Sequence, residues 1–383
     1  MLSLPWIRVF ASDRFRLALA GLLLALGVVA VGGYLLARAG EPLEVGQFGI
    51  DFADYRAAAG RLAETGSPYA PDMLAGPVAA QGLDRYRYPP PFAQLLVPLS
   101  AISLEATTRL WLLVQAACLL AAGWIAGEAA ALPRSLERAL WTGAATAWFL
   151  PVLDTLWKGN VSGLQALLVA FLFAGPAVSG GALAANGLLK LTPVLLAPLA
   201  VLRGRRSALA LVAGGLAVAV PSILAAPAAW GDYVLVLGNL VRGSADYASN
   251  LAPDALLRHT LGLGAPWDTM VRAGSLGLGL GLLVLGWRWA RRPYGWAGAV
   301  TAGVAATLLI PAAFWYHYLV VLLPVAVLAW GAARGGLRTA LVAGGVLVSV
   351  GVAWLPLALV GAIVVGATAL TALRPGHPGR AAA

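Results

Sequence analysis

The 383-residue sequence is poor in charge: Asp, Glu, Lys and Arg make up 11% of it, while hydrophobic residue types make up 60%. Soluble domains are about a quarter charged, so this composition excludes an ordinary soluble protein. Several apolar runs approach or exceed the ~20 residues with which a helix crosses a bilayer. The alternating strands of a transmembrane barrel do not occur. We therefore expect an all-α polytopic membrane protein.

Cysteine is almost absent as well. Cys118 is the single cysteine and lies in an apolar run, so an internal disulfide is excluded and the redox compartment stays undecided. No His, Cys or Asp residues have the spacing of a metal site, and no glycine-rich phosphate loop opens a helix after a strand. The net charge of +10 comes from short arginine clusters between apolar runs, which indicates cytoplasmic loops rather than a nucleic-acid-binding surface.

The first apolar run predicts the orientation of the chain. It covers about residues 16–39 and follows Arg8, Arg14 and Arg16. Because arginines favour the cytoplasmic side, we expect the N-terminus in the cytoplasm and residues 40–92 outside, as a large first loop. No small-residue cleavage site follows closely, so the run is expected to be a retained anchor rather than a signal peptide.

The remaining runs predict nine further crossings and one hairpin. A single span over 181–202 would place the "RGRR" of 203–206 outside, against the positive-inside rule. A break at Lys190 to Pro193 avoids this and gives a re-entrant hairpin with Lys190 at its tip, since Pro193 suits the first turn of a new helix. One tilted helix with misplaced arginines is the alternative. In total we expect twelve helical segments in one integral membrane domain, 1–383, with both termini cytoplasmic and a second outer loop over 228–266. The further crossings are expected at about 105–127, 139–156, 160–177, 207–226, 268–287, 294–312, 318–332, 338–354 and 357–373.

Acidic residues gather in the first outer loop, where seven of the sixteen acids lie between residues 41 and 84. In this loop an apolar stripe with helical spacing predicts an amphipathic helix on the membrane surface, ending at "GSPY" (66–69). Asp51 lies at its start, either as a helix N-cap or as a fixed carboxylate that can act as a general base, and both can hold. Asp54 lies one turn further on and is the second candidate. The stripe consists of Phe52, Tyr55, Ala59 and Leu62.

The segment "RYRYPPPFAQLLVPLS" (85–100) closes the same loop. Its run of three consecutive prolines, 89–91, predicts an extended approach to the membrane. Arg85 and Arg87 place positive charge at the outer interface. They either bind lipid phosphate or pair with nearby acids, and the sequence does not separate the two.

The sequence contains only two lysines and twenty-four arginines. Lys158 lies at an outer helix end, where snorkelling explains it. Lys190 is predicted within the bilayer, where an ionisable group is costly and tends to be functional. Its partner is expected to be anionic, either Asp154 or a bound phosphate. His317, in "FWYHY", is either part of an interfacial aromatic belt or a polar group of a site on the same outer face.

Taken in order, these motifs resemble glycosyltransferase family 87, which includes the mycobacterial phosphatidylinositol-mannoside mannosyltransferases. The resemblance covers roughly residues 45–325. Each motif alone is weakly specific for the family, and the ordered set of motifs is what identifies it. One departure is that Asn stands at position 160, where Gln is commoner in the family. The matching motifs are Asp51 with Tyr55, Tyr88-Pro89-Pro90, Gly159-Asn160-Val161, Lys190 to Pro193, Asn250 with Arg258, and Trp315 to His317.

The resemblance implies an enzyme with a GT-C-type fold. It would transfer a sugar, typically mannose, with inversion at the anomeric carbon. The donor would be a polyprenyl-phosphate sugar and the acceptor a lipid or glycolipid on the extracytoplasmic face of the cell membrane, with no cofactor, metal or nucleic acid and with the chain acting as a monomer. The alternatives are a different GT-C activity (glucosyl, arabinosyl or aminoarabinosyl transfer), a polytopic transporter or lipid flippase, and an assembly protein without chemistry. The implied catalytic residues are Asp51, with Asp54 as second choice, and His317; the donor-phosphate-binding residues are Lys190, Arg258 and Arg242; and the substrate-binding residues are Tyr55, Arg87, Tyr88, Asn160 and Asn250.

Overall fold

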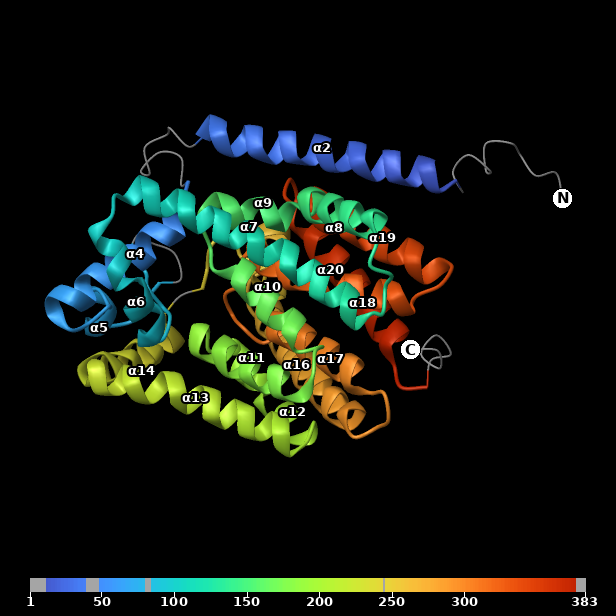
Figure 1. Cartoon of the computed structure of the whole chain (residues 1–383). Helices are drawn as coiled ribbons and strands as arrows, with labels where there is room; N and C mark the ends of the chain where they lie inside the picture. Colours follow the sequence, from blue (N-terminus) through green and yellow to red (C-terminus); the bar gives the residue numbers. More distant parts are fainter. Residues whose placement is uncertain (1–11, 39–47, 80–83, 244, 377–383) are drawn as a thin grey trace.

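The computed structural model describes residues 12–38, 48–79, 84–243 and 245–376. Within these ranges the chain is helical and forms no strand, as the composition predicts (Figure 1). Many large apolar side chains on these helices are exposed, which is costly in water and favourable in a bilayer. Five helices are long and apolar enough to cross a membrane: α2 (Asp13–Arg38), α7 (Leu104–Ala129), α13 (Arg205–Ala225), α16 (Trp267–Ala290) and α20 (Leu355–Leu373).

Shorter apolar helices account for the other predicted crossings, and the count of ten crossings stays a prediction. The predicted third span is divided at Phe149 into two helices, since Pro151 begins a new helix more readily than it continues one. The shorter helices are α8 (Leu136–Trp148), α9 (Leu150–Lys158), α10 (Ser162–Phe171), α11 (Pro176–Leu189), η2 (Thr192–Leu196), α12 (Ala197–Leu202), α17 (Trp296–Leu309), η3 (Tyr316–Val321), α18 (Leu322–Ala332) and α19 (Gly336–Val350).

The break predicted at Lys190 is present. α11 ends at Leu189, Lys190 has extended backbone angles, and η2 begins at Thr192 with Pro193 in its first turn. The two arms of this segment therefore consist of α11 on one side and η2 with α12 on the other. Two segments of about half a membrane thickness meet at a lysine, as the hairpin interpretation requires.

The two outer loops of the prediction also contain helices. Residues 40–92 hold α4 (Ile50–Thr65), α5 (Pro71–Ala75) and the start of α6 (Pro90–Leu96), which η1 (Val97–Ala101) continues, while residues 39–47 and 80–83 lie outside the described part of the chain. The second predicted loop, 228–266, holds most of α14 (Pro227–Arg242) and all of α15 (Pro253–Leu261). In Figure 1, α4, α5, α6 and α14 gather at one end of the bundle. They form a cap over that end.

Basic side chains mark the opposite end of the bundle. Arg203, after α12, donates to the carbonyls of Leu172 and Ala174 that end α10, and Trp296 at the start of α17 donates to the same Leu172 carbonyl. Arg138 and Glu128 form an ion pair between the adjoining ends of α8 and α7. Cations placed at helix carbonyl ends are favourable. The arginine clusters thus have a structural role beside the topological one.

The apolar face of α4 differs from its prediction. Phe52, Tyr55, Ala59 and Leu62 are all buried, as their spacing predicts. They pack against α6, η1 and α7 rather than lying on lipid, so the interpretation of a surface-lying apolar stripe is wrong. The physical reason is that the loop supplies its own aromatic partners, which fill this space.

Two local expectations in this region also need correction. Asp51 is not the N-cap of α4: Gly49 occupies that position with φ 70°, and Asp51 lies in the first turn, where its charge still favours the helix N-terminus. The three prolines do not form one extended approach, because only Pro89 is extended and Pro90 begins α6. α4 ends at Thr65 with Gly66 in a left-handed C-cap, so the predicted stop at "GSPY" is confirmed.

Candidate functional site

Asp51 is held where α4 meets the junction of α9 and α10. Its Oδ2 accepts a hydrogen bond from Asn160 Nδ2 at 2.7 Å. Gly159, with φ 66°, ends α9 and turns the chain into Asn160; a Cβ at this glycine would lie 2.9 Å from the Cβ of Phe52. Only glycine therefore allows both the left-handed turn and this close approach of α4. The Gly49 N–H donates to the Trp157 carbonyl at 2.8 Å and ties the two segments together again.

A chain of buried hydroxyls continues from Asn160. Its Nδ2 also donates to the Tyr55 hydroxyl at 3.2 Å, and the Tyr55 and Tyr88 hydroxyls lie 2.9 Å apart. The Tyr69 hydroxyl donates to the Tyr88 carbonyl. Tyr55 and Tyr88 are buried against Phe92 with edge-on ring geometry. The structure thus brings together Asp51, Tyr55, Tyr88 and Asn160, four of the residues predicted for the site.

Lys190 and Arg87 supply positive charge in the same region. Both the Asp51 carboxylate and the Arg87 guanidinium are within electrostatic range of the Lys190 ammonium. The Lys190 Nζ lies 3.1 Å from the centroid of the Tyr318 ring, and Arg87 lies over the Trp315 ring at 5.3 Å. Within the described part of the chain the Lys190 ammonium has no hydrogen bond and no ion pair, and only the backbone N–H of Lys190 is bonded, to the Asn186 carbonyl. A cation held by a ring face keeps its N–H donors for another group.

His317 belongs to a second charged group next to these residues. Its Nδ1 lies 3.2 Å from Asp154 Oδ2, and Lys158 Nζ lies 3.5 Å from the other oxygen of Asp154. The imidazole is buried and meets the Tyr318 ring edge-on at 4.9 Å. Asp154 therefore pairs with His317 and Lys158, not with Lys190 as one of the two sequence alternatives has it. Lys158 has an ion-pair partner, which the snorkelling interpretation did not include.

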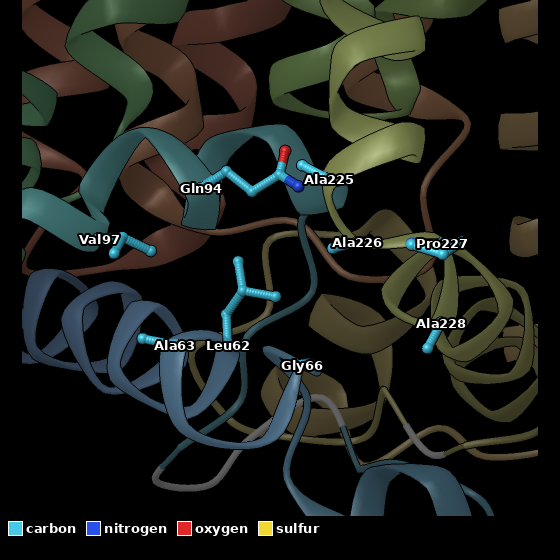
Figure 2. Close-up of a pocket in the computed structure, with 9 residues that line it drawn as sticks. All are labelled: Leu62, Ala63, Gly66, Gln94, Val97, Ala225, Ala226, Pro227 and Ala228. Carbon is cyan, nitrogen blue, oxygen red and sulfur yellow. The ribbon is translucent and has the colours of Figure 1, made fainter.

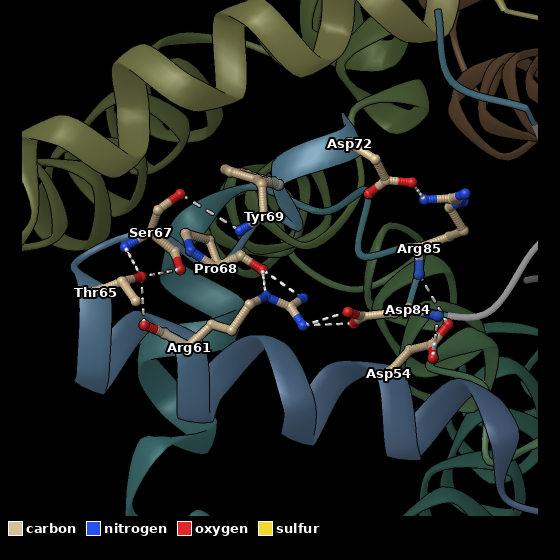
Figure 3. Close-up of polar contacts among 9 residues, drawn as sticks. All are labelled: Asp54, Arg61, Thr65, Ser67, Pro68, Tyr69, Asp72, Asp84 and Arg85. Carbon is tan, nitrogen blue, oxygen red and sulfur yellow. Dashed lines mark hydrogen bonds and ion pairs between the residues drawn. The ribbon is translucent and has the colours of Figure 1, made fainter. Parts of the chain in front are cut away.

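Asp54 differs from Asp51 in its environment, and Figure 3 shows the polar contacts around Asp54. Its two carboxylate oxygens accept the backbone N–H groups of Asp84 (2.9 Å) and Arg85 (3.2 Å). Burial raises the pKa of Asp54 to about 6, and the two N–H bonds oppose this only in part. Arg61 pairs with Asp84 and Arg85 pairs with an acid of α5, so for Arg85 the acid-pairing alternative holds. Asp54 anchors a loop.

Three predicted substrate residues are engaged elsewhere. Arg258 forms ion pairs with Asp246 (2.9 Å) and Asp268 (3.1 Å), which neutralise it. Arg242 donates to Asn239 and to a carbonyl within α14. Asn250 is 1% exposed, and its amide donates to the carbonyls of residues 245 and 312 while its oxygen accepts the N–H groups of residues 252 and 314. With these bonds Asn250 fixes two loops together, ahead of η3.

Sequence reasoning missed Tyr318 as a part of this site, and it gave Trp315 no role beyond the family motif Trp315 to His317. Both stand in "FWYHY", where only His317 was a candidate site residue. The signal for Tyr318 was the isolated lysine itself, because a cation without an acidic partner is favoured by an aromatic face.

The described cavities lie away from Asp51. A groove of about 470 Å³ opens between the second half of α4, α6 with η1, and the corner of α13 and α14 (Figure 2). Its one polar side chain is Gln94, whose amide donates to the Ser222 carbonyl. The groove is therefore apolar and carries no chemistry. Among the described residues no group of three or more His, Cys, Asp or Glu side chains is placed to hold a metal.

Comparison with known proteins identifies the family. No curated protein and no solved structure matches the chain. The family model described as glycosyltransferase family 87 matches residues 86–311, more than half of the chain. The match includes Tyr88, Asn160 and Lys190, starts after Asp51 and ends before His317. The chain belongs to glycosyltransferase family 87.

Proposed function

We propose that this membrane glycosyltransferase transfers mannose from a polyprenyl-phosphate donor to a lipid or glycolipid acceptor, with inversion at the anomeric carbon. One observation carries the proposal. The Lys190 ammonium lies over the Tyr318 ring, has no ionic partner among the described residues, and is within electrostatic range of the Asp51 carboxylate. A base and an available cation at one site are what displacement of a phosphate by an alcohol requires.

In the proposed reaction Asp51 accepts the proton of the acceptor hydroxyl as its oxygen attacks the anomeric carbon. The new bond joins that carbon to the acceptor oxygen, and the bond from the same carbon to the donor phosphate breaks. The bonding electrons leave with the phosphate, whose added negative charge Lys190 and Arg87 stabilise. His317, oriented by Asp154, is the third group near this charge. A single displacement inverts the anomeric centre.

The roles proposed for other predicted residues follow from their partners. Tyr55 and Tyr88 are buried and packed behind Asp51. They act on the substrate only through Asp51 and do not touch it themselves. Arg258 and Arg242 are engaged with protein groups, so the phosphate role passes to Lys190 and Arg87. Asp54 holds Asp84 and is not the base.

The extracytoplasmic placement of the site is also a proposal. The cap of α4, α5, α6 and α14 stands at one end of the bundle, and the arginine-bearing helix ends stand at the other. Because arginines favour the cytoplasmic side, the cap faces outward. A donor carried by a lipid reaches the enzyme from the bilayer. A site at the cap lies at the membrane surface, where such a donor can enter.

The test uses purified protein in liposomes with labelled polyprenyl-phosphate mannose and membrane glycolipid extract. Wild type is expected to form a labelled glycolipid whose mannosyl linkage is inverted relative to the donor, while Asp51→Asn forms at most a trace. Equal product from both proteins would remove Asp51 as the base. Movement of labelled lipid across the liposome without product would instead indicate a flippase.

A further inference from the structure

We propose that Asn160 is a positioning residue that holds the Asp51 carboxylate in place for catalysis, and that it does not bind substrate. The proposal rests on the proposed role of Asp51 as general base. It starts from the position of Asn160, which is 3% exposed at the junction of α9 and α10 and lies against the first turn of α4.

Every hydrogen-bonding position of the Asn160 amide is used within the protein. Its Nδ2 has two N–H donors, and these go to Asp51 Oδ2 (2.7 Å) and to the Tyr55 hydroxyl (3.2 Å). Its Oδ1 has two acceptor positions, which take the Ser162 backbone N–H (2.9 Å) and the Ser162 hydroxyl (2.6 Å). An amide offers two donors and two acceptor positions. None is left for a sugar or a phosphate.

The same bonds determine which way the amide points. The Ser162 backbone N–H can only donate, so the atom facing it must be the oxygen Oδ1. Nδ2 must then face Asp51, and an N–H donor favours the ionised carboxylate there. Asn160 thereby holds one oxygen of Asp51 as an acceptor.

The other oxygen of Asp51 is available for chemistry. Within the described residues Oδ1 of Asp51 has no hydrogen bond, while Oδ2 is held by Asn160. Asn160 is itself fixed by Ser162 on α10 and by the turn at Gly159. A misplacement of a reacting group by about 1 Å costs on the order of 100-fold in rate. A clamp on one oxygen therefore determines where the other meets the acceptor hydroxyl.

Two substitutions separate positioning from packing. Asn160→Ala removes the clamp, so kcat is expected to fall about 100-fold while the KM for the donor stays within threefold. Asn160→Asp keeps the shape but places two carboxyls against each other, which then share a proton. The acid limb of the pH–rate profile of Asn160→Asp is expected to move at least one pH unit upward.

The other titratable groups that interact electrostatically with Asp51 are the same in each variant: Asp54, Tyr55, Tyr88, Lys190, His317 and Tyr318.

The experiment measures single-turnover mannosyl transfer in proteoliposomes with synthetic polyprenyl-phosphate mannose. Asn239→Ala is the matched control, because Asn239 is an equally buried amide on α14 that bonds to α5 and Arg242. It is expected to keep kcat within threefold of wild type. Asn160→Ala is also made in the Asp51→Asn background, where a residue acting through Asp51 costs nothing further.

The proposal fails if Asn160→Ala and Asn160→Asp both match wild type in kcat and pH profile. It also fails if Asn160→Ala costs the same factor with and without Asp51, because Asn160 would then act independently of the base. Full activity of Asp51→Asn alone is a separate result, which would overturn the proposed function itself.

Discussion

Replacing Lys190 by methionine removes a cation that lies over the Tyr318 ring, has no ionic partner among the described residues, and is within electrostatic range of Asp51. Methionine keeps the length and apolar body of the side chain. At about 4 Å from a phosphate oxygen and an effective dielectric constant of about 20, a unit charge contributes roughly 4 kcal/mol. Loss of a single electrostatic donor to a developing oxyanion typically costs 100- to 1,000-fold in kcat. We therefore expect kcat to fall by roughly 1,000-fold.

The assay for Lys190→Met is single-turnover transfer of labelled mannose, with donor binding measured separately by equilibrium competition. Lys158→Met is the matched control, since Lys158 is the other lysine and forms an ion pair with Asp154; it is expected to lose less than tenfold. Tyr318→Phe, which keeps the ring under Lys190, should lose less than threefold, whereas Tyr318→Leu should lose more than tenfold. A Lys190→Met rate within threefold of wild type would refute the assignment of the leaving phosphate to Lys190.

Two further predictions concern stability. Burial raises the pKa of Asp54 to about 6 in the folded protein, from 3.8 for an exposed aspartate. Its stabilising contribution is therefore complete below about pH 4 and is lost as pH rises through 6. Relative to Asp54→Asn, wild type should lose up to about 3 kcal/mol between pH 4 and pH 7, seen as a falling Tm in lipid nanodiscs; a pH-independent difference in Tm would contradict this. Gly159→Ala should lower the Tm, because alanine there carries about 1–2 kcal/mol of left-handed strain and its Cβ meets Phe52. Gly60→Ala, in open space within α4, should raise the Tm, because alanine favours the helix. Equal shifts of the Tm in the two variants would show that the close approach at Gly159 is unimportant.

Hydrophobic runs predicted much of the fold because a bilayer leaves few choices for an apolar backbone. α2, α7, α13, α16 and α20 lie within a few residues of their expected spans. The break at Lys190 was also predictable, since arginine parity and a proline both required it. The positions of the long helices and of this break were thus predictable from charge and helix length, while the orientation across the membrane stays a prediction.

Side-chain partners were less predictable, because they depend on which loop segments meet. Nothing in the spacing of α4 says that its apolar face packs on α6 rather than on lipid. For the same reason Asp54 looked equivalent to Asp51 in sequence, one turn away, yet its oxygens are taken by the backbone of the returning loop. Arg258 looked available in the sequence, but the structure pairs it with Asp246 of a loop and Asp268 of the first turn of α16.

The most direct test of the account compares two carboxylates of one helix, Asp51 and Asp54. Each is replaced by asparagine, and the single-turnover rate of mannosyl transfer is measured at pH 7.5 with folding verified by the Tm. The account predicts a loss of roughly 1,000-fold or more for Asp51→Asn and less than tenfold for Asp54→Asn, because only Asp51 has an oxygen free for the acceptor. The reverse order of the two losses, or equal losses, would contradict it.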